Sequence, residues 1–334
     1  METKSIVRSI LLLPLICLLL LVSCGAGNKH KENAKSVPMS VIVPIFNGDS
    51  AYSFVNSQVA FGPRVPNTQA HVDCGNWLES KLRGYGAEVV AQNMELTAYN
   101  GTKLQARNII AQFQPENKKR VLLCAHWDSR PWADSDPNPD NHYKPILGAN
   151  DGGSGVGVLL EIARQISMVP TTIGVDIVLF DAEDYGVHEK ESSEMEHSWA
   201  LGSQYWARMP HKNNYNARYG ILLDIVGAPG SKFHKERISV HFAESIVNKI
   251  WSCASNLGYG DTFISEDGGY ITDDHFYVNQ FLGVPCIDII NYDPESPNGF
   301  GPHHHTMNDN MDWISADMLK IVGQTVLTVI YNEK

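Results

Sequence analysis

The chain has 334 residues, of which 43% are hydrophobic, so it is long and apolar enough to bury the core of a large globular domain. Its formal net charge of -11 argues against a surface that binds nucleic acid or anionic membranes. We therefore expect no nucleic-acid partner. No linker or internal repeat divides the region after the first forty residues, which favours a single domain there.

The N-terminus has the pattern of a bacterial lipoprotein signal. Lys4 and Arg8 precede an apolar run from Ile10 to Val22, which is too short to span a bilayer comfortably. The run ends at Cys24, in a sequence that resembles a lipoprotein box, where the cysteine carries the lipid. The alternative is an ordinary secretory signal with an accidental cysteine at this position.

The pattern predicts three parts along the chain. They are a signal peptide over 1–23, a polar lipidated tether over 24–37, and one domain over 38–334. Several acyl chains on Cys24 would anchor the protein stably, so we expect membrane contact through this lipid only. The expected location is the periplasmic face of the outer membrane or the cell surface.

Helical and strand patterns alternate after the tether. Helices are predicted over 50–60, 68–84, 155–166, 199–208, 239–256 and 316–331. Strands are predicted over 88–99, 104–113, 121–125, 175–180, 219–225 and 284–290, and the first two are joined by a turn at Asn100-Gly101. This order predicts an α/β three-layer sandwich with a mixed, mostly parallel central sheet, helices on both faces and an antiparallel hairpin at one side.

Acids and histidines follow the predicted strands or precede a helix. They are His126, Asp151, the Glu183-Asp184 pair, Asp224 and His305. One such residue alone is more typical of a helix cap or a turn. As a set at the rim where open α/β sheets bind ligands, they match the nitrogen and oxygen ligands of catalytic zinc. Glu183, next to a ligand, is then placed to shuttle a proton.

Several motifs around these residues resemble one family. They are Gly148–Gly155, Phe180–Gly186 with Leu201–Ser203 beyond it, Leu223–Ala228 and the pair His305-Thr306. In this order they are similar to the motifs of the zinc-dependent aminopeptidase superfamily, and the resemblance extends over about residues 50–333. It implies action on the N-terminal residue of peptides, and it leaves two branches of the superfamily open.

In the first branch, aminopeptidases bind two zinc ions. The resemblance assigns one ion to His126 and Asp224. It assigns the other to Asp184 and His305, with Asp151 as the bridging ligand. The glutamate that precedes Asp184 would be the general base of peptide hydrolysis.

In the second branch, glutaminyl cyclases of animal type and related bacterial enzymes bind one zinc ion. The resemblance assigns it to Asp151, Asp184 and His305, with Glu183 as the catalytic acid and base. These enzymes also keep a residue that matches His126, either as a second-metal ligand or as a remnant of one, so the ligand set does not separate the branches.

The segment Thr272–His275 favours the cyclase branch, together with a long insertion over 187–198 that we interpret as a surface loop. In the cyclases, by this resemblance, the second aspartate of the segment, here Asp274, hydrogen-bonds the residue that matches Asp224. Two carboxylates that close share a proton and bind a second cation poorly. The resemblance therefore implies one Zn²⁺ per chain, with Asp224 and Asp274 as catalytic residues that hold the departing amide.

The chain departs from the vertebrate cyclases at two aromatic positions. It has His304 and Glu189 where they have tryptophans. The aromatic walls for the substrate must then come from elsewhere. Candidates are Trp127, Trp132 and Trp199, and His304 is itself a candidate substrate contact. The acidic stretch 134–140 is interpreted as a solvated turn, because prolines interrupt a possible calcium loop.

The sequence as a whole favours a glutaminyl-peptide cyclotransferase, a zinc-dependent acyltransferase. It would convert the N-terminal Gln of peptides or proteins to pyroglutamate and release ammonia. The alternative is a two-zinc aminopeptidase. A binding protein without catalysis is disfavoured, because the ligand set and Glu183 are both present.

Overall fold

The computed structural model describes residues 42–191, 197–296 and 299–334. The predicted signal peptide over 1–23, the lipidation site Cys24 and the tether over 24–37 lie outside these residues. So does the middle of the predicted insertion, at 192–196. Among the described helices, none combines the length and the apolar character needed to cross a bilayer.

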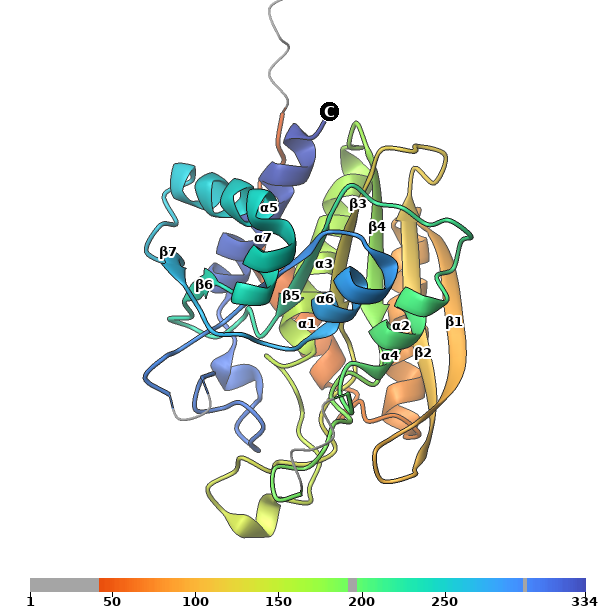
Figure 1. The fold of residues 1–334 in the computed structure, drawn as a ribbon, viewed down its shortest axis with the longest axis vertical. Coiled ribbons are helices and arrows are strands. Elements are labelled where there is room, and N and C mark those ends of the chain that lie inside the picture. The colour runs from red at the N-terminus through yellow and green to blue at the C-terminus, as the bar shows by residue number, and fades with distance from the viewer. Residues whose placement is uncertain (1–41, 192–196, 297–298) are drawn as a thin grey trace, which may run out of the picture. The chain divides into compact units, whose positions relative to one another are not determined.

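A six-stranded sheet forms the middle of the domain, with the strand order β1-β2-β4-β3-β5-β8 (Figure 1). The strands are β1 (Glu88–Thr97), β2 (Lys103–Phe113), β3 (Arg120–His126), β4 (Gly174–Phe180), β5 (Gly220–Asp224) and β8 (Cys286–Ile290). Strands β4, β3, β5 and β8 run parallel, and the β1–β2 hairpin adds antiparallel strands at one edge. The predicted mixed, mostly parallel sheet is confirmed.

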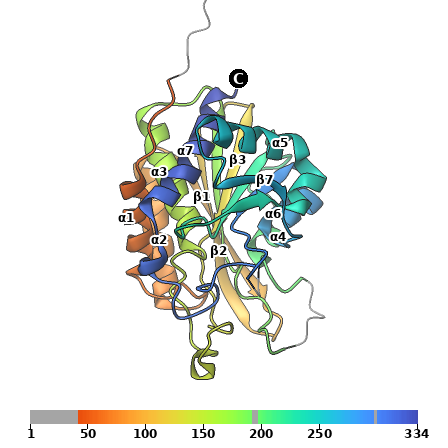
Figure 2. The ribbon, with the colours of Figure 1, turned by 90° about the vertical axis from the view of Figure 1, so that its left-hand side faces the viewer.

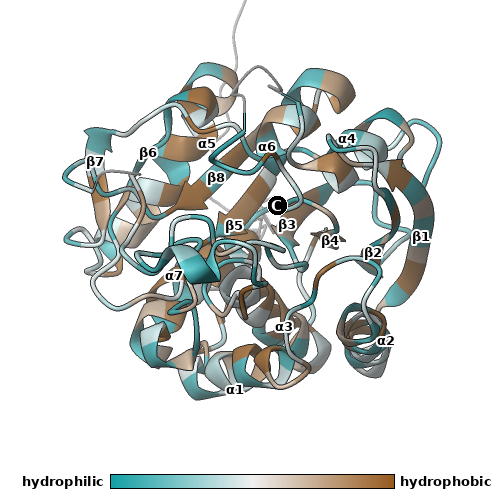
Figure 3. Cartoon of the chain, turned by 90° about the horizontal axis from the view of Figure 1, so that it is seen from below, coloured by the Kyte–Doolittle hydropathy of each residue, from teal (hydrophilic) through white to brown (hydrophobic). Residues whose placement is uncertain are grey.

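Helices cover both faces of this sheet (Figures 2 and 3). One face carries α1 (Gly48–Val59), α2 (Gln69–Gly84), α3 (Gly153–Met168) and α7 (Ala316–Asn332). The other carries α4 (Leu201–Arg208) and α6 (Asp274–Tyr277), while α5 (Arg237–Asn256) packs against the edge strand β8 and against α7. The three-layer arrangement is therefore the predicted one.

The ends of all the predicted elements agree with the structure to within two residues. Polar caps set several of these ends: the side chain of Thr68 accepts from the backbone N–H of His71 at the start of α2, and that of Ser315 accepts from Met318 at the start of α7.

The sequence pattern missed the shorter elements. They are a small parallel sheet of β6 (Phe233–Lys235) and β7 (Phe263–Asp267), the helix α6, the 3₁₀ turns Pro139–Asn141 and Met311–Trp313, and the π-helical turn Val278–Leu282. Each spans five residues or fewer, which is too short for a hydrophobic period to be read.

The central strands are buried on both faces because alternate residues pack on opposite sides. In β3, Val121 and Leu123 join the core under α1, α3 and α7. Leu122 and Cys124 join the core under α4. The apolar run seen in the sequence thus packs into two cores, and the polar side chains of β3 are confined to its two ends.

One end of β3 carries a buried ion pair. The Arg120 guanidinium donates to both carboxylate oxygens of Asp176, at 2.7 and 2.6 Å, and Tyr215 donates its hydroxyl to the same carboxylate at 3.0 Å. Asp176 is fully buried. The pair joins β3 to β4 at the end of the sheet opposite His126.

Arg120→Met is expected to lower the free energy of unfolding by about 3–5 kcal/mol, because it leaves the Asp176 carboxylate buried without its cation. Arg83→Met, which breaks an exposed pair with Glu79, is expected to cost about 1 kcal/mol or less. Denaturant unfolding of both variants tests this. Equal losses would show that the buried pair contributes no more than the exposed one.

Candidate metal centre and active site

The carboxyl ends of the parallel strands border a cavity of about 290 Å³. Its walls hold the predicted residues Asp151, Glu183, Asp184, Asp224 and His305. Further walls come from Trp199, Ile271, Thr272, Asp273, Ile290, Phe300 and His304. Four loops that are distant in the sequence converge here because parallel strands end at the same edge of the sheet.

The three residues predicted to hold one zinc ion meet at the side chain of His305. The described groups whose ligand atoms all lie within 4.8 Å of one another join Asp151 and His305 with His304, and join Asp184 with His126 and Glu183. The Nε2 atom of His305 lies 3.4 Å from Asp151 Oδ2 and 3.4 Å from Asp184 Oδ1. Ligand atoms that share a tetrahedral zinc ion at about 2 Å lie about 3.3 Å apart. Asp151 Oδ2 and Asp184 Oδ2 are buried without a hydrogen-bond partner among the described residues, and a bound cation would satisfy both oxygens. The structure brings the three predicted ligands together.

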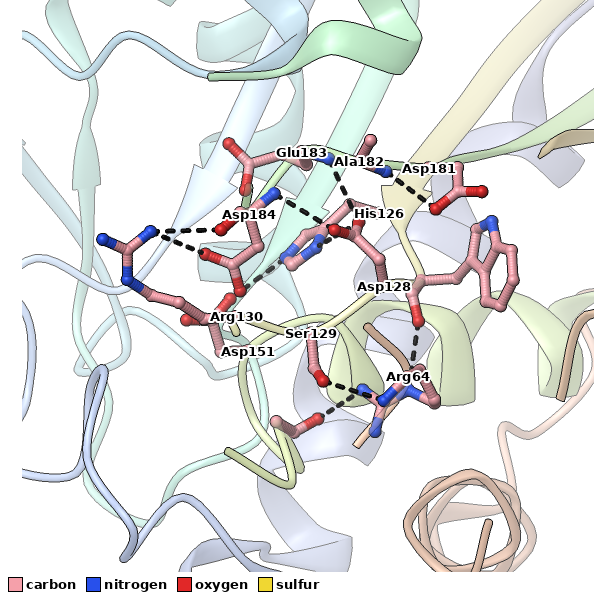
Figure 4. Close-up of polar contacts among 12 residues, drawn as sticks. Arg64, His126, Asp128, Ser129, Arg130, Asp151, Asp181, Ala182, Glu183 and Asp184 are labelled. Carbon is pink, nitrogen blue, oxygen red and sulfur yellow. Dashed lines mark hydrogen bonds and ion pairs between the residues drawn. The ribbon is translucent and has the colours of Figure 1, made fainter. Parts of the chain in front are cut away.

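A second group shares Asp151 with the first, and Figure 4 shows two of its members, His126 and Asp151. His126 Nε2 lies 3.1 Å from Asp151 Oδ1 and 3.1 Å from Asp224 Oδ1. Burial lowers the pKa of His126, but its hydrogen bonds to Asp128, Asp151 and Asp224 outweigh this and raise the pKa well above its usual value. The group can therefore hold either a second metal ion or a proton on His126, and its geometry fits both.

The carboxylate that faces the cavity beside Asp224 is that of Asp273, not that of Asp274. Asp273 caps α6, and its Oδ1 accepts from the backbone N–H of Asp274. Asp274 is thus the first helical residue; its side chain is fully buried outside the cavity lining, near Ser203. Among the described residues, no hydrogen bond joins Asp224 to Asp274 as predicted, and none joins Asp224 to Asp273. Asp273 rather than Asp274 lines the cavity, because one step along a helix turns a side chain by about 100°.

The pair of Asp224 and Asp273 is acidic; Asp273 is buried and Asp224 is half-buried. Burial, reinforced by the charge of Asp273, raises the pKa of Asp224 to about 7. Burial likewise raises the pKa of Asp273. Each charge opposes the ionisation of the other carboxyl, so the pair favours holding a proton over carrying two negative charges.

Glu183 has the surroundings of a proton acceptor. Its side chain borders the cavity and is 9% exposed. Burial, together with the charges of Asp273 and Asp184, raises the pKa of Glu183 well above its usual value. A carboxylate whose basicity is increased in this way takes up a proton more readily than one in water.

Backbone strain is concentrated at the metal centre. Ala182, Ile225 and His305 have φ angles of 54°, 40° and 53°, in the left-handed region that residues with side chains avoid. Each lies at or beside a candidate ligand or at Glu183. Such residues cost about 1–3 kcal/mol each and persist where the surrounding structure imposes them.

Gly152 allows the loops to meet. Its φ is 82°, and a Cβ atom on it would lie 2.2 Å from the carbonyl oxygen of Asp128. A residue with a side chain would push Asp151 away from the loop that follows β3. This explains a glycine immediately after a metal ligand and just before α3.

Residues 108–330 match peptidase family M28. The chain belongs to this family. A solved Zn-dependent exopeptidase from Parabacteroides distasonis is 58% identical to it, with a TM-score of 0.86, and the match covers 87% of this chain and 100% of the other. The glutaminyl cyclase of Bacteroides thetaiotaomicron, solved with N-acetylhistamine bound, is 56% identical, also with a TM-score of 0.86; here 88% of this chain and 100% of the other are covered.

An aminopeptidase is among the more distant relatives. Aminopeptidase YwaD of Bacillus subtilis is 26% identical over 299 residues, which is 85% of this chain and 57% of that protein. The chain therefore spans little more than half the length of this relative. Both activities named in the sequence analysis are thus represented among the relatives of this M28 member.

The aromatic candidates separate clearly. Trp199 borders the cavity, with its ring parallel to that of His305 at 5.8 Å. His304 also borders it, stacked on His305 at 3.7 Å and beside Phe300. Trp127 does not: it is fully buried, stacks on His71 and donates to the carbonyl of Arg107, so its predicted contact with substrate was wrong. His126, its neighbour in the sequence, belongs to the second group, but the Trp127 side chain packs in the core.

A second layer of carboxylates holds the first. Asp128 accepts from the backbone N–H groups of Glu183 and Asp184, at 3.1 and 3.2 Å. Asp309 accepts from the N–H groups of Asn150 and Asp151, at 2.7 and 3.1 Å. The sequence analysis did not identify these roles. For Asp128, its position two residues after His126 was a usable signal; for Asp309, no comparable signal was present.

The acidic stretch after β3 also contributes to this layer. Asp134 is 3% exposed and pairs with Arg130, and Asp136 is 7% exposed and accepts from the backbone of Met307. The prediction of a solvated turn was therefore wrong for these two residues, although Asp140 is exposed as expected. The reason is the long-range partner of each carboxylate, which the local sequence does not reveal.

Metal content tests the two groups separately. The wild-type chain and His126→Ala are expected to retain one zinc ion, and His305→Ala to retain none, because it removes the nitrogen that the first group shares. Stripping zinc from the wild type should lower its melting temperature, and adding zinc should restore it; His305→Ala should not respond. Two zinc ions in the wild type and one in His126→Ala would instead show that the second group holds a metal ion.

Proposed function

We propose that this chain is a glutaminyl-peptide cyclotransferase, which closes the N-terminal Gln of peptides into pyroglutamate and releases ammonia. The observation that carries this proposal is the 56% identity to the Bacteroides thetaiotaomicron glutaminyl cyclase over that protein's entire length. A solved structure described as a leucine aminopeptidase precursor, also from Bacteroides thetaiotaomicron, is equally similar at 56%. Further support for the cyclase comes from the solved glutaminyl cyclases of Tannerella forsythia and Porphyromonas gingivalis, which are 58% and 51% identical. The enzyme class is thus an acyltransferase on the M28 scaffold.

We propose one Zn²⁺ per chain, held by Asp151, Asp184 and His305. Bound there, it would act as a Lewis acid on the γ-carboxamide of the substrate. The position of His126 supports a single ion, because an imidazolium between Asp151 and Asp224 would supply one of the two positive charges that a second zinc would bring. Asp224, with its raised pKa, is a poor ligand while it shares a proton.

The chain's own residues then supply the proton transfers. Glu183 accepts a proton from the α-amino group as the nitrogen attacks the γ-carbonyl carbon and the ring C–N bond forms. Glu183 returns that proton to the amide nitrogen as the original C–N bond breaks and ammonia leaves. Asp224 and Asp273 accept hydrogen bonds from the departing amide. Because the attack is intramolecular, the enzyme mainly holds a reactive conformation.

The walls of the cavity determine what enters. Trp199, Phe300 and Ile290 provide apolar surface, whereas five carboxylates line the polar side. A neutral Gln side chain suits such a site better than an anionic one. The substrates proposed are peptides or proteins with N-terminal Gln.

The activity assay separates the two enzyme functions. The zinc-loaded chain is expected to release ammonia from a Gln-initiated peptide and to leave a leucine anilide intact. Glu183→Gln should keep its zinc and lose about a hundred-fold or more in kcat, because the proton acceptor is gone. Anilide cleavage without ammonia release would overturn the proposal in favour of an aminopeptidase, and neither activity would favour a binding protein. Full turnover in Glu183→Gln would refute only the proton-shuttle role.

We also propose that the chain is exported and anchored by a lipid on Cys24, supported by the lipoprotein box at 21–24. This would place the enzyme among exported or environmental peptides, whose N-termini pyroglutamate protects from aminopeptidases.

Cys24→Ser tests the anchor, because it removes the sulfur that carries the lipid. In a bacterial host, the wild type is expected in the membrane fraction and Cys24→Ser outside it, by immunoblot of fractionated cells. The same distribution for both proteins would contradict lipid anchoring.

A further inference from the structure

Arg130 is a fully buried cation beside the metal centre. Its Nε and Nη2 atoms donate to the two carboxylate oxygens of Asp134, at 2.7 and 2.5 Å. Nη1 and Nη2 also donate to the carbonyl oxygens of Asp184 and Val187, both at 3.1 Å. This planar, two-pronged arrangement is specific to a guanidinium; a lysine ammonium cannot reproduce it.

Two of the three candidate zinc ligands are tied to this side chain. Nη1 lies 4.0 Å from Asp184 Oδ1, and Figure 4 shows Arg130 reaching Asp184 from the side away from Glu183. The link to His305 runs through the 134–135 segment: Asp134 Oδ1 lies 3.8 Å from His305 Nδ1, and the N–H of Ser135 donates to the His305 carbonyl. At 3.8 Å the contact is electrostatic rather than a hydrogen bond, and the negative charge of Asp134 favours a ring orientation that turns Nδ1 toward it.

The same guanidinium supports an aromatic wall of the cavity. Its central carbon lies 4.4 Å from the ring centre of Trp199, which is cation–π distance. Gly186 leaves room for the indole, since a Cβ atom there would lie 2.0 Å from it. Trp199 in turn lies parallel to the ring of His305. The wall and the metal ligand therefore share one support.

We propose that Arg130 is a positioning residue that holds two parts of the active site in place at the same time. Through Asp134 it orients the zinc ligand His305, and through its contact with Trp199 it holds the wall against which the substrate packs. The first part requires only a bound zinc ion. The second part rests on the proposed function. A Lys at this position would keep the charge but would lose the paired contact with Asp134 and the flat contact with the indole.

The chain contains a matched control for a merely structural role. Arg120 is also buried, also donates to both oxygens of one aspartate, and also binds backbone carbonyls. It begins β3, whereas Arg130 follows the other end of that strand. Arg120→Lys should therefore reproduce the loss of packing and hydrogen bonds without reaching the metal centre.

The experiment compares Arg130→Lys with Arg120→Lys in the zinc-loaded chain. Three quantities are measured: denaturant stability, the rate of zinc loss to a chelator, and kcat and KM for a Gln-initiated peptide. Arg130→Lys is expected to lose zinc about ten-fold faster and to raise KM about ten-fold. Arg120→Lys should lose comparable stability but leave zinc loss and KM within about two-fold of wild type.

Two further variants separate the two contacts of Arg130, the one through Asp134 to His305 and the one to Trp199. Asp134→Asn is expected to accelerate zinc loss more than it raises KM, because it weakens only the support of His305. Trp199→Phe should raise KM and leave zinc loss unchanged. The affinity of the zinc-loaded variants for N-acetylhistamine reports on ligand binding at the Trp199 wall independently of turnover. These two variants also decide the proposal if Arg130→Lys does not fold.

The outcomes distinguish this proposal from the proposed function. The positioning role is wrong if Arg130→Lys behaves like Arg120→Lys in both zinc loss and KM. It is also wrong if Asp134→Asn leaves zinc loss unchanged and Trp199→Phe leaves KM unchanged. If the wild type releases no ammonia, the cyclase proposal fails. In that case, faster zinc loss and weaker N-acetylhistamine binding in Arg130→Lys would still support the positioning role, and their absence would overturn it.

Discussion

The active site depends on a concentration of buried negative charge at one edge of the sheet. Six carboxylates gather there, contributed by Asp128, Asp151, Glu183, Asp184, Asp224 and Asp273. Buried carboxylates are stable only when cations, hydrogen bonds or shared protons compensate them. His126, His305 and Arg130 supply part of that compensation, and a zinc ion between Asp151, Asp184 and His305 would supply more. A bound metal ion and a proton on Asp224 both compensate this negative charge, so the number of metal ions and the protonation of Asp224 depend on each other.

The scaffold brings these charges together and holds them by hydrogen bonds from behind. Asp128 and Asp309 bind backbone N–H groups next to the ligands, and Arg64 ties the loop after β3 to the loop before α3 through the carbonyls of Trp127 and Gly148. This support explains how the left-handed conformations of Ala182 and His305 persist. The free energy gained by packing the core offsets the cost of keeping strained, like-charged groups together at this site.

The choice between cyclisation and hydrolysis depends on the same balance. Asp151 turns one oxygen toward the His305 group and the other toward the His126 group, so one scaffold serves either one or two cations. A proton on His126 favours one zinc ion and leaves Asp224 and Asp273 free to hold an amide. A second zinc ion would instead occupy Asp224 and favour a metal-bound hydroxide. Under the proposed mechanism, the metal content and the product would both depend on the protonation of His126 and Asp224.

The sequence by itself determined the long elements and the main candidate ligands of this protein. Long strands and helices were predicted to within two residues because hydrophobic periodicity is local, and Asp151, Glu183, Asp184, Asp224 and His305 were found because each follows a strand or begins a helix in a recognisable motif. Tertiary structure alone decided which neighbours of these residues take part. Asp273 rather than Asp274 lines the cavity because the cap fixes where the helix begins. Trp199 and not Trp127 faces the cavity, and Arg130 contacts Asp134, Asp184 and Trp199. Side-chain direction and long-range pairing depend on how segments pack against each other, and no local pattern in the chain specifies that.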